Sequence, residues 1–268
     1  MTVLIVVRGP RIGACNICGE VGTLTEDHTP PKGCLRPTQV EIRHISNLLS
    51  ADEASTRGYR SQNGVKYRTL CQRCNNSLLG ARYDPAFIAF VNEIGQFLKS
   101  SLHLPPALTV RGQPQAILRS LLGHISAQGV DRYQKGPLTE PIRDYILDES
   151  KPFPEGLCAY YWAYPHRYHV MVRDAAFLDI PSGNPFSIWL LKFFPVAFLV
   201  TWGRPTYLEY MPQPFEPWRN SPFAHEVEMP IALRPAIPAF WPDAPTDRSI
   251  LAYGLEAVHA ESITKRPK

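Results

Sequence analysis

The stretch Cys15-Asn16-Ile17-Cys18 is matched further along the chain by Cys71-Gln72-Arg73-Cys74, with 52 residues between the two pairs. A two-residue gap allows both thiolates of one pair to bind the same metal ion, and two such pairs complete a tetrahedral Zn²⁺ shell. The separation exceeds the roughly 15–20 residues of an ordinary zinc ribbon, so the pairs enclose an elaborated insert. We therefore predict a structural zinc site whose ligands are Cys15, Cys18, Cys71 and Cys74. The alternative is two coincidental pairs of small apolar thiols.

The insert carries the segment Asp27-His28-Thr29-Pro30-Pro31-Lys32, and Asn75 directly follows the last cysteine. This pattern resembles the HNH (ββα-metal) endonuclease family in its four-cysteine, zinc-binding subclass, over residues 1–84. The resemblance implies a treble-clef-like module with the Asp-His pair at the end of a short hairpin and a helix after the second cysteine pair. It also implies that His28 is a general base and that Asp27 and Asn75 bind a catalytic Mg²⁺ or Mn²⁺ ion.

Two features of the resemblance leave alternatives open. The family's middle Asn has no clean match, and Asn63 and Asn47 are the candidates that the chain offers. Asn75 is also a good helix N-cap whatever the chemistry, and Asn76 beside it could share either role. A bacterial defence or mobile-element setting is implied by the family alone.

These residue types suit phosphodiester hydrolysis. A neutral imidazole can take a proton from water near neutral pH, because its ordinary pKa lies close to 6.5. A divalent ion held by carboxylate and amide oxygens can bind the scissile phosphate and stabilise the departing alkoxide. The predicted zinc takes no part in this chemistry and only brings residues 28 and 75 together.

Charge favours a nucleic-acid partner, DNA more than RNA. The formal net charge of +4 lies wholly within residues 1–84, because the rest of the chain has equal numbers of acidic and basic residues. The segment 54–83 contains six basic residues and no acidic one. Such a segment can contact several phosphates, and the alternative is an ordinary solvated basic face. The residues predicted to contact nucleic acid are Lys32, Arg57, Arg60, Lys66 and Arg68.

Composition predicts a cytoplasmic protein with no membrane segment; it leaves the oligomeric state unknown. The longest apolar run, residues 186–202, is interrupted by Lys192 and Pro195 and is shorter than the roughly 20 residues of a membrane span. Four of the six cysteines are assigned to zinc, which leaves Cys34 and Cys158 as free thiols suited to a reducing compartment.

The pattern beyond residue 84 predicts a second, α+β domain over residues 85–268, of unknown role. Asp84-Pro85 reads as a helix start, and the helices are expected within residues 85–148: one ending before Pro105, others at 114–127 and 139–147. Strands are expected at 2–7 in the first domain and within 157–211 in the second, where 157–164 and 168–173 form a hairpin and 188–191, 196–202 and 206–211 follow. Residues 212–268 are expected to be a Pro-rich, mostly extended or irregular tail and a terminal helix at 246–260.

Three histidines of this second region have ordinary interpretations. His166 and His169 lie among tyrosines and a tryptophan, where strand packing is favoured over a surface on which bases stack. His124 is expected at the edge of the apolar face of its helix.

The sequence thus predicts an α+β protein with an N-terminal zinc-stabilised ββα-metal module, and two functions. The first is a metal-dependent endonuclease that hydrolyses phosphodiester bonds. The second is a non-catalytic zinc-binding module that binds nucleic acid or a partner protein, which the missing middle Asn favours.

Overall fold

The computed structural model describes residues 8–35, 38–49, 58–100, 103–133, 139–205, 208 and 210–263. Helices and antiparallel strands are mixed along this part of the chain, which confirms the α+β class. None of the described helices is long and apolar enough to cross a membrane. The helical segments are α1 (Ser46–Leu49), η1 (Arg73–Tyr83), α2 (Asp84–Ser100), α3 (Pro114–Ala127), α4 (Thr139–Leu147) and the short η2 (Glu216–Trp218).

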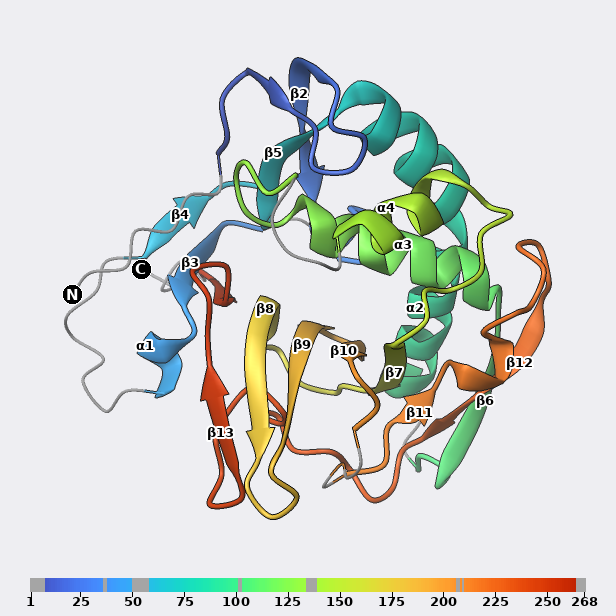
Figure 1. The fold of residues 1–268 in the computed structure, drawn as a ribbon. Coiled ribbons are helices and arrows are strands. Elements are labelled where there is room, and N and C mark those ends of the chain that lie inside the picture. Colours follow the sequence, from blue (N-terminus) through green and yellow to red (C-terminus); the bar gives the residue numbers. More distant parts are fainter. Residues whose placement is uncertain are drawn as a thin grey trace, which may run out of the picture.

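The largest sheet has nine strands and draws on both ends of the chain (Figure 1). Its spatial order is β11 (Gln213–Pro214), β7 (Leu157–Ala163), β10 (Val196–Trp202), β9 (Asn184–Phe193), β8 (His169–Asp179), β14 (Val258–Ser262), β3 (Val40–His44) and β4 (Tyr59–Ser61), with β13 (Ser249–Ala252) also paired to β8. A three-stranded sheet contains β1 (Ile12–Ala14), β2 (Val21–His28) and β5 (Lys66–Cys71), and a separate pair contains β6 (Ala107–Gly112) and β12 (Val227–Ala232).

Helices cover one face of the nine-stranded sheet. Phe87 of α2 packs on Phe198 of β10, with ring centroids 5.2 Å apart, and Phe90 meets Tyr161 of β7 edge-on at 5.7 Å. The other face packs against irregular chain that includes Ile237 and Trp241. Burial of apolar side chains on both faces makes the sheet the centre of the molecule.

Helix α3 lies between the three-stranded sheet and the nine-stranded sheet, and every one of its 14 residues is buried (Figure 1). A helix buried all round must be apolar or must satisfy each of its polar groups. Arg119 meets most of this requirement: its two terminal nitrogens donate to Gln115 Oε1 at 2.9 Å and to the main-chain carbonyls of Glu149 (3.1 Å) and Lys151 (2.9 Å), while its Nε has no hydrogen-bond partner among the described residues.

The predicted division at residue 84 does not coincide with a break in the structure. Helix η1 continues directly into α2, so Asp84 has helical backbone angles rather than those of an N-cap. Strands β3 and β4 belong to the same sheet as β7 to β14, and one apolar core includes Ile17, Leu79 and Phe198. The two predicted units therefore share one core.

The helices predicted at 114–127 and 139–147 are confirmed, as is the helix beginning near Asp84. The predicted hairpin of 157–164 with 168–173 is wrong, because β10 and β9 lie between β7 and β8. The predicted terminal helix at 246–260 is also wrong. That segment forms β13 and β14, because β8 and β3 offer unpaired backbone groups there and strand pairing outweighs local helical pattern. The predicted strand at 2–7 lies outside the described residues; that at 206–211 lies partly outside them, and its described residues form no strand.

Candidate functional site

The four cysteines of the two pairs meet at one end of the three-stranded sheet. Cys15 and Cys18 lie in the loop between β1 and β2, Cys71 ends β5, and Cys74 is in the first turn of η1. All four sulfur atoms lie within 4.8 Å of one another, and Cys18 Sγ is 3.7 Å from Cys71 Sγ. A tetrahedral ion with Zn–S bonds of about 2.3 Å requires S···S distances of about 3.8 Å. The donors and their spacing therefore fit a zinc ion.

Backbone hydrogen bonds hold the first cysteine pair in a tight loop. Cys15 N donates to Glu20 O (3.0 Å), and Gly19 N donates to Cys15 O (2.9 Å). Gly19 has φ +76°, and a Cβ atom there would lie 2.0 Å from Tyr133 Cζ, so only glycine fits. Burial raises the pKa of the Cys18 thiol to about 12, and the neighbouring Cys15 thiolate contributes to the rise. A bound dication would offset both effects.

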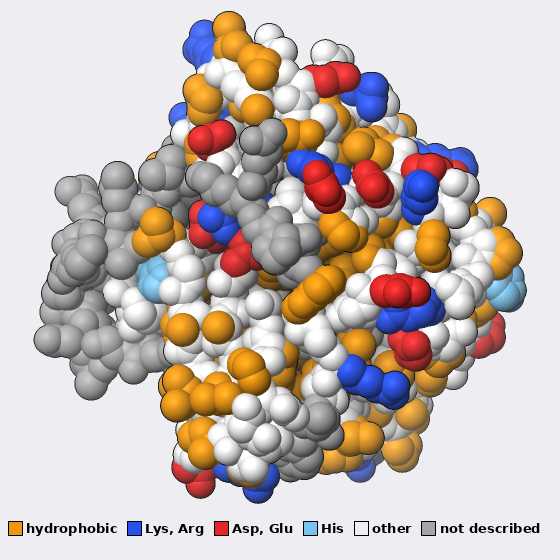
Figure 2. Space-filling view, viewed as in Figure 1, with side chains coloured by type: hydrophobic (Ala, Val, Ile, Leu, Met, Phe, Trp, Pro, Cys, Tyr) orange, Lys and Arg blue, Asp and Glu red, His pale blue; other side chains and the backbone are white. Residues whose placement is uncertain are grey.

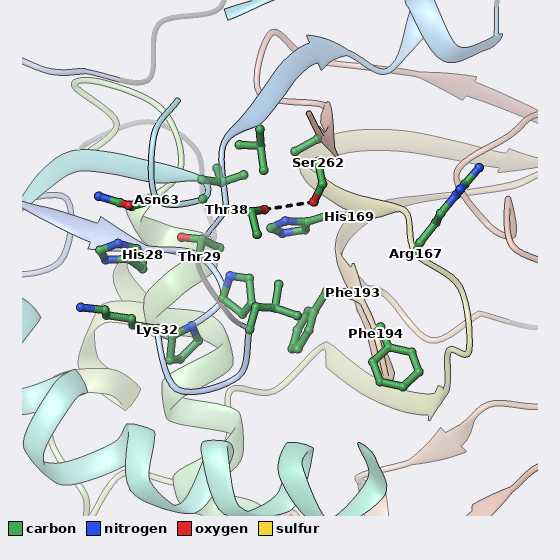
Figure 3. Close-up of a pocket in the computed structure, with 17 residues that line it drawn as sticks. His28, Thr29, Lys32, Thr38, Asn63, Arg167, His169, Phe193, Phe194 and Ser262 are labelled. Atoms are coloured by element: carbon green, nitrogen blue, oxygen red, sulfur yellow. Dashed lines mark hydrogen bonds between the residues drawn. The ribbon is translucent and has the colours of Figure 1, made fainter. Parts of the chain in front are cut away.

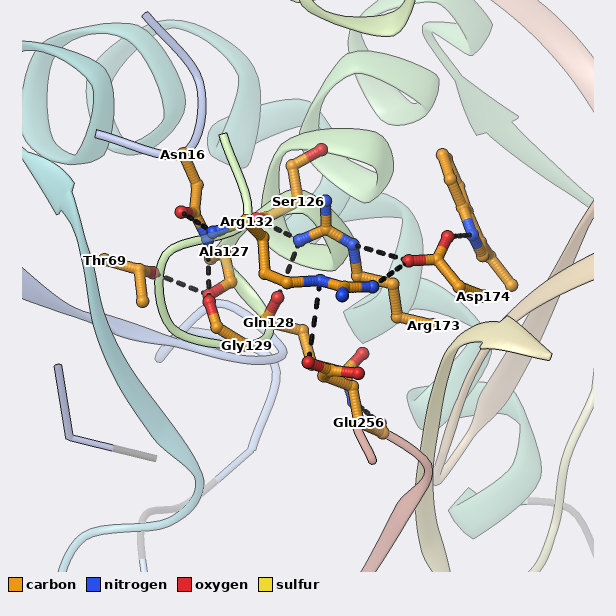
Figure 4. A network of polar contacts seen from close by, with 11 residues as sticks. Asn16, Thr69, Ser126, Ala127, Gln128, Gly129, Arg132, Arg173, Asp174 and Glu256 are labelled. Atoms are coloured by element: carbon orange, nitrogen blue, oxygen red, sulfur yellow. Dashed lines mark hydrogen bonds and ion pairs between the residues drawn. The ribbon is translucent and has the colours of Figure 1, made fainter. Parts of the chain in front are cut away.

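The first cysteine pair is anchored to the C-terminal end of α3 (Figure 4). Asn16 Nδ2 donates to the carbonyls of Ser126 (3.0 Å) and Gly129 (2.8 Å), and Thr69 Oγ1 of β5 donates to Ala127 O (2.6 Å). From the other side, Arg173 of β8 donates to Ser126 O at 2.7 Å. The final carbonyls of a helix have no partner within the helix, so these side chains satisfy them. The cysteine loop and the large sheet are thereby joined through one helix end.

His28 ends β2 and faces a cavity of about 160 Å³ (Figure 3). Its imidazole is half-buried, and burial lowers its pKa below the ordinary 6.5; the charges of Lys66 and Lys32 lower it further, although Asp27 opposes them. The ring is therefore neutral at pH 7 and can accept a proton. Lys32 and Asn63 extend on the same side as His28 in Figure 3.

Asp27 faces the interior instead, although it precedes His28 directly. Its carboxylate is 1% exposed, and Oδ2 lies 2.8 Å from His124 Nδ1. His124 Nε2 lies 2.9 Å from Asp84 Oδ1, which also accepts a hydrogen bond from Ser120 Oγ at 2.8 Å. The expectation that His124 lies at the edge of an apolar face is thus wrong: it is buried between two carboxylates from β2 and α2.

Charge balance explains the state of this triad. Burial alone would lower the pKa of His124, but the carboxylates of Asp27 and Asp84 outweigh it and raise that pKa to about 10. The imidazolium therefore sits between two buried carboxyl groups at neutral pH. Asp27 Oδ1 is buried and has no hydrogen-bond partner among the described residues, so one carboxylate oxygen is left for a further partner.

Asn75 lies in the first turn of η1, against β2. Its Nδ2 donates to Thr25 Oγ1 (2.8 Å) and to Glu26 O (3.1 Å), next to the bulge between Thr25 and Glu26. These bonds leave the amide oxygen, the atom that could bind a metal, for another partner. Asn76 is exposed. Of the two middle-Asn candidates, Asn63 lines the cavity with His28, whereas Asn47 lies on α1.

The predicted phosphate-contacting residues are dispersed. Lys66 Nζ is 2.7 Å from Glu26 Oε2 and Arg68 Nη2 is 3.3 Å from Glu26 Oε1, so one carboxylate partly neutralises both. Arg60 is exposed on β4, Lys32 is exposed beside the cavity, and Arg57 lies outside the described residues. On the face shown in Figure 2, acidic and basic side chains are interspersed rather than separated.

The cavity was not foreseen from the sequence, because its walls come from distant segments. The pairing of β14 with β3 and β8 brings Ser262 beside Thr38 and His169. The aromatic cluster around His169 was the only local signal. Among known proteins, no family matches this chain, and no curated protein and no solved structure is similar to it.

Proposed function

We propose that this protein is a metal-dependent endonuclease that hydrolyses phosphodiester bonds, preferentially in DNA, with His28 as general base. The observation that supports it best is the neutral imidazole of His28 at the end of β2, open to a cavity and flanked by Lys32 and Asn63. A base must reach both water and substrate and must be unprotonated at working pH; the cavity beside His28 and the lowered pKa of its ring support this role.

The four cysteines bind a structural zinc ion in this proposal. The zinc joins the β1–β2 loop, the end of β5 and the start of η1. Because zinc binding in such sites supplies folding free energy, the positions of β2 and η1 depend on it.

A catalytic Mg²⁺ or Mn²⁺ ion would be held by Asp27 and Asn75. These oxygen ligands suit a hard cation, since Asp27 Oδ1 is buried and has no hydrogen-bond partner among the described residues. The amide nitrogen of Asn75 already donates two hydrogen bonds, which leaves the amide oxygen to face the ion. Such an ion supplies charge stabilisation at the leaving oxygen when bound. His28 takes the proton of the attacking water, and Lys32 neutralises charge on the phosphate.

The second candidate is a zinc-binding module without catalytic activity that binds nucleic acid or a protein. The engagement of Asp27 by His124 favours it, because a carboxylate already paired to an imidazolium is a weaker metal ligand.

Cleavage of supercoiled plasmid by the purified protein with Mg²⁺ or Mn²⁺ tests the proposal. His28→Ala should abolish cleavage and leave zinc content and Tm unchanged, whereas His225→Ala, at an exposed and distant histidine, should cut like the wild type. If the wild type hydrolyses no single-stranded DNA, double-stranded DNA or RNA with either ion, the binding module becomes the better interpretation.

A further inference from the structure

The cavity beside His28 lies between the two ends of the chain. One wall is formed by the segment after β2, including Pro30, Pro31 and Thr38, and the opposite wall by β8, β9 and β14, including His169, Phe193 and Ser262 (Figure 3). Its volume of about 160 Å³ suits a single small ring system and excludes a duplex.

The walls combine flat apolar surfaces with a few polar groups. Phe193 and the two prolines offer apolar faces, and His169 packs edge-on near Phe193 with ring centroids 6.2 Å apart. His169 Nε2 is buried and has no hydrogen-bond partner among the described residues. The Thr38 and Ser262 hydroxyls lie 3.0 Å apart where the two walls meet. Aromatic faces with one or two oriented polar atoms are what a heteroaromatic ring requires.

The neutral imidazole of His169 can both donate and accept a hydrogen bond. Burial lowers its pKa to about 4, so the ring is neutral at pH 7 and carries one donor and one acceptor nitrogen. The exposed cations Lys32 and Arg167 lie among the cavity residues and can contact phosphates outside it. A polyanionic strand can therefore lie across the opening while an uncharged ring enters.

We infer that this cavity binds one nucleobase of the substrate strand, next to the phosphate at which His28 acts as general base. The inference rests on the proposed nuclease function for the position of the phosphate. Because the base must leave its stack to enter, the preferred substrate is single-stranded or locally unpaired nucleic acid, for which the unstacking cost is smallest. The large sheet thereby acquires a role, since it supplies the wall that contacts the base.

The test measures binding without cleavage, in the His28→Ala background. Fluorescence anisotropy compares a short labelled single-stranded DNA with a strand of equal length made of tetrahydrofuran abasic units, which keeps the phosphates and removes the bases. Binding of a base by stacking predicts that the abasic strand binds at least about fivefold more weakly. Equal affinities for the two strands, or no binding of the DNA strand, would overturn the inference.

A second variant locates the effect in this cavity. Ser262 is exposed at the end of β14, so Ser262→Trp fills the opening without touching the core. It should reduce the base-dependent ratio, the affinity for the DNA strand divided by that for the abasic strand, to near one. Glu261→Trp adds the same ring to the opposite side of the strand and should keep the ratio, since its lost charge affects both strands alike. A ratio unchanged by Ser262→Trp places the base elsewhere and contradicts the inference. If the DNA strand binds more tightly than the abasic strand but the wild type cleaves no substrate, the nuclease proposal is refuted and the nucleobase site remains.

Discussion

The Asp27–His124–Asp84 triad allows a quantitative prediction. In His124→Leu the side-chain volume stays similar, but two buried carboxyl groups lose the imidazolium between them. Removal of one partner from a buried ion pair costs about 3–5 kcal/mol, because the remaining charge is left uncompensated. In a chain of this size, at roughly 2–4 °C per kcal/mol, that loss should lower Tm by about 6–20 °C.

The loss should depend on pH in a defined way. In the wild type the pKa of His124 is raised to about 10, so its contribution is complete below the ordinary 6.5 and disappears as pH rises toward 10. In His124→Leu, burial without a counter-charge raises the pKa of Asp27 and Asp84, so the variant gains relative stability at acid pH as these groups take up protons. The difference between the two proteins should therefore be largest near neutral pH and smaller on either side.

Urea unfolding in excess zinc, followed by circular dichroism at several pH values, measures this difference. Ser120→Ala is the control, since it removes one neutral donor from Asp84 and should cost only about 1–2 kcal/mol. Adding Asp84→Asn to His124→Leu should recover part of the loss, because one buried charge disappears. A His124→Leu loss below about 1 kcal/mol, or one that is constant from pH 5 to pH 9, would refute the reasoning.

Three further predictions concern metal, protonation and substrate charge. Metal analysis should find about one zinc per chain in the wild type, and Cys74→Ser should lose both the zinc and the folded N-terminal strands. The rate of cleavage should fall only as pH drops below 6.5, because burial lowers the pKa of His28 and it stays unprotonated above that value. Lys32→Gln should weaken DNA binding and flatten its salt dependence by about one ion, whereas Lys66→Gln should do less because Lys66 is paired with Glu26.

Each of these has a contrary result. A fully folded Cys74→Ser protein would remove the stabilising role of zinc. A cleavage rate that already falls between pH 8 and pH 7 would show that His28 is protonated too easily for this site. A larger effect of Lys66→Gln than of Lys32→Gln would mean that substrate displaces the Glu26 ion pair.

Local features were predictable from the sequence, and long-range ones were not. Helix α3 could be placed because its apolar residues repeat at helical spacing, and the cysteine pairs could be placed because metal geometry constrains short segments. The partners of His124 could not be predicted, since Asp27 and Asp84 are 97 and 40 residues away. The cavity depends on β14 pairing with β3 across the length of the chain, and no local periodicity encodes that register.

The position of β3 has a consequence for how the chain is made. Because β3 pairs with β14 along one of its edges, the hydrogen bonds between these two strands can form only after residues 258–262 have been synthesised. Arg173 must likewise be synthesised before the carbonyl of Gln128, just after α3, can accept its hydrogen bond. The cysteine-bearing segment is therefore not expected to fold independently of the rest of the chain. Residues 1–84 expressed alone would display one edge of β3 and the apolar side of η1 to water, and we expect such a fragment to aggregate.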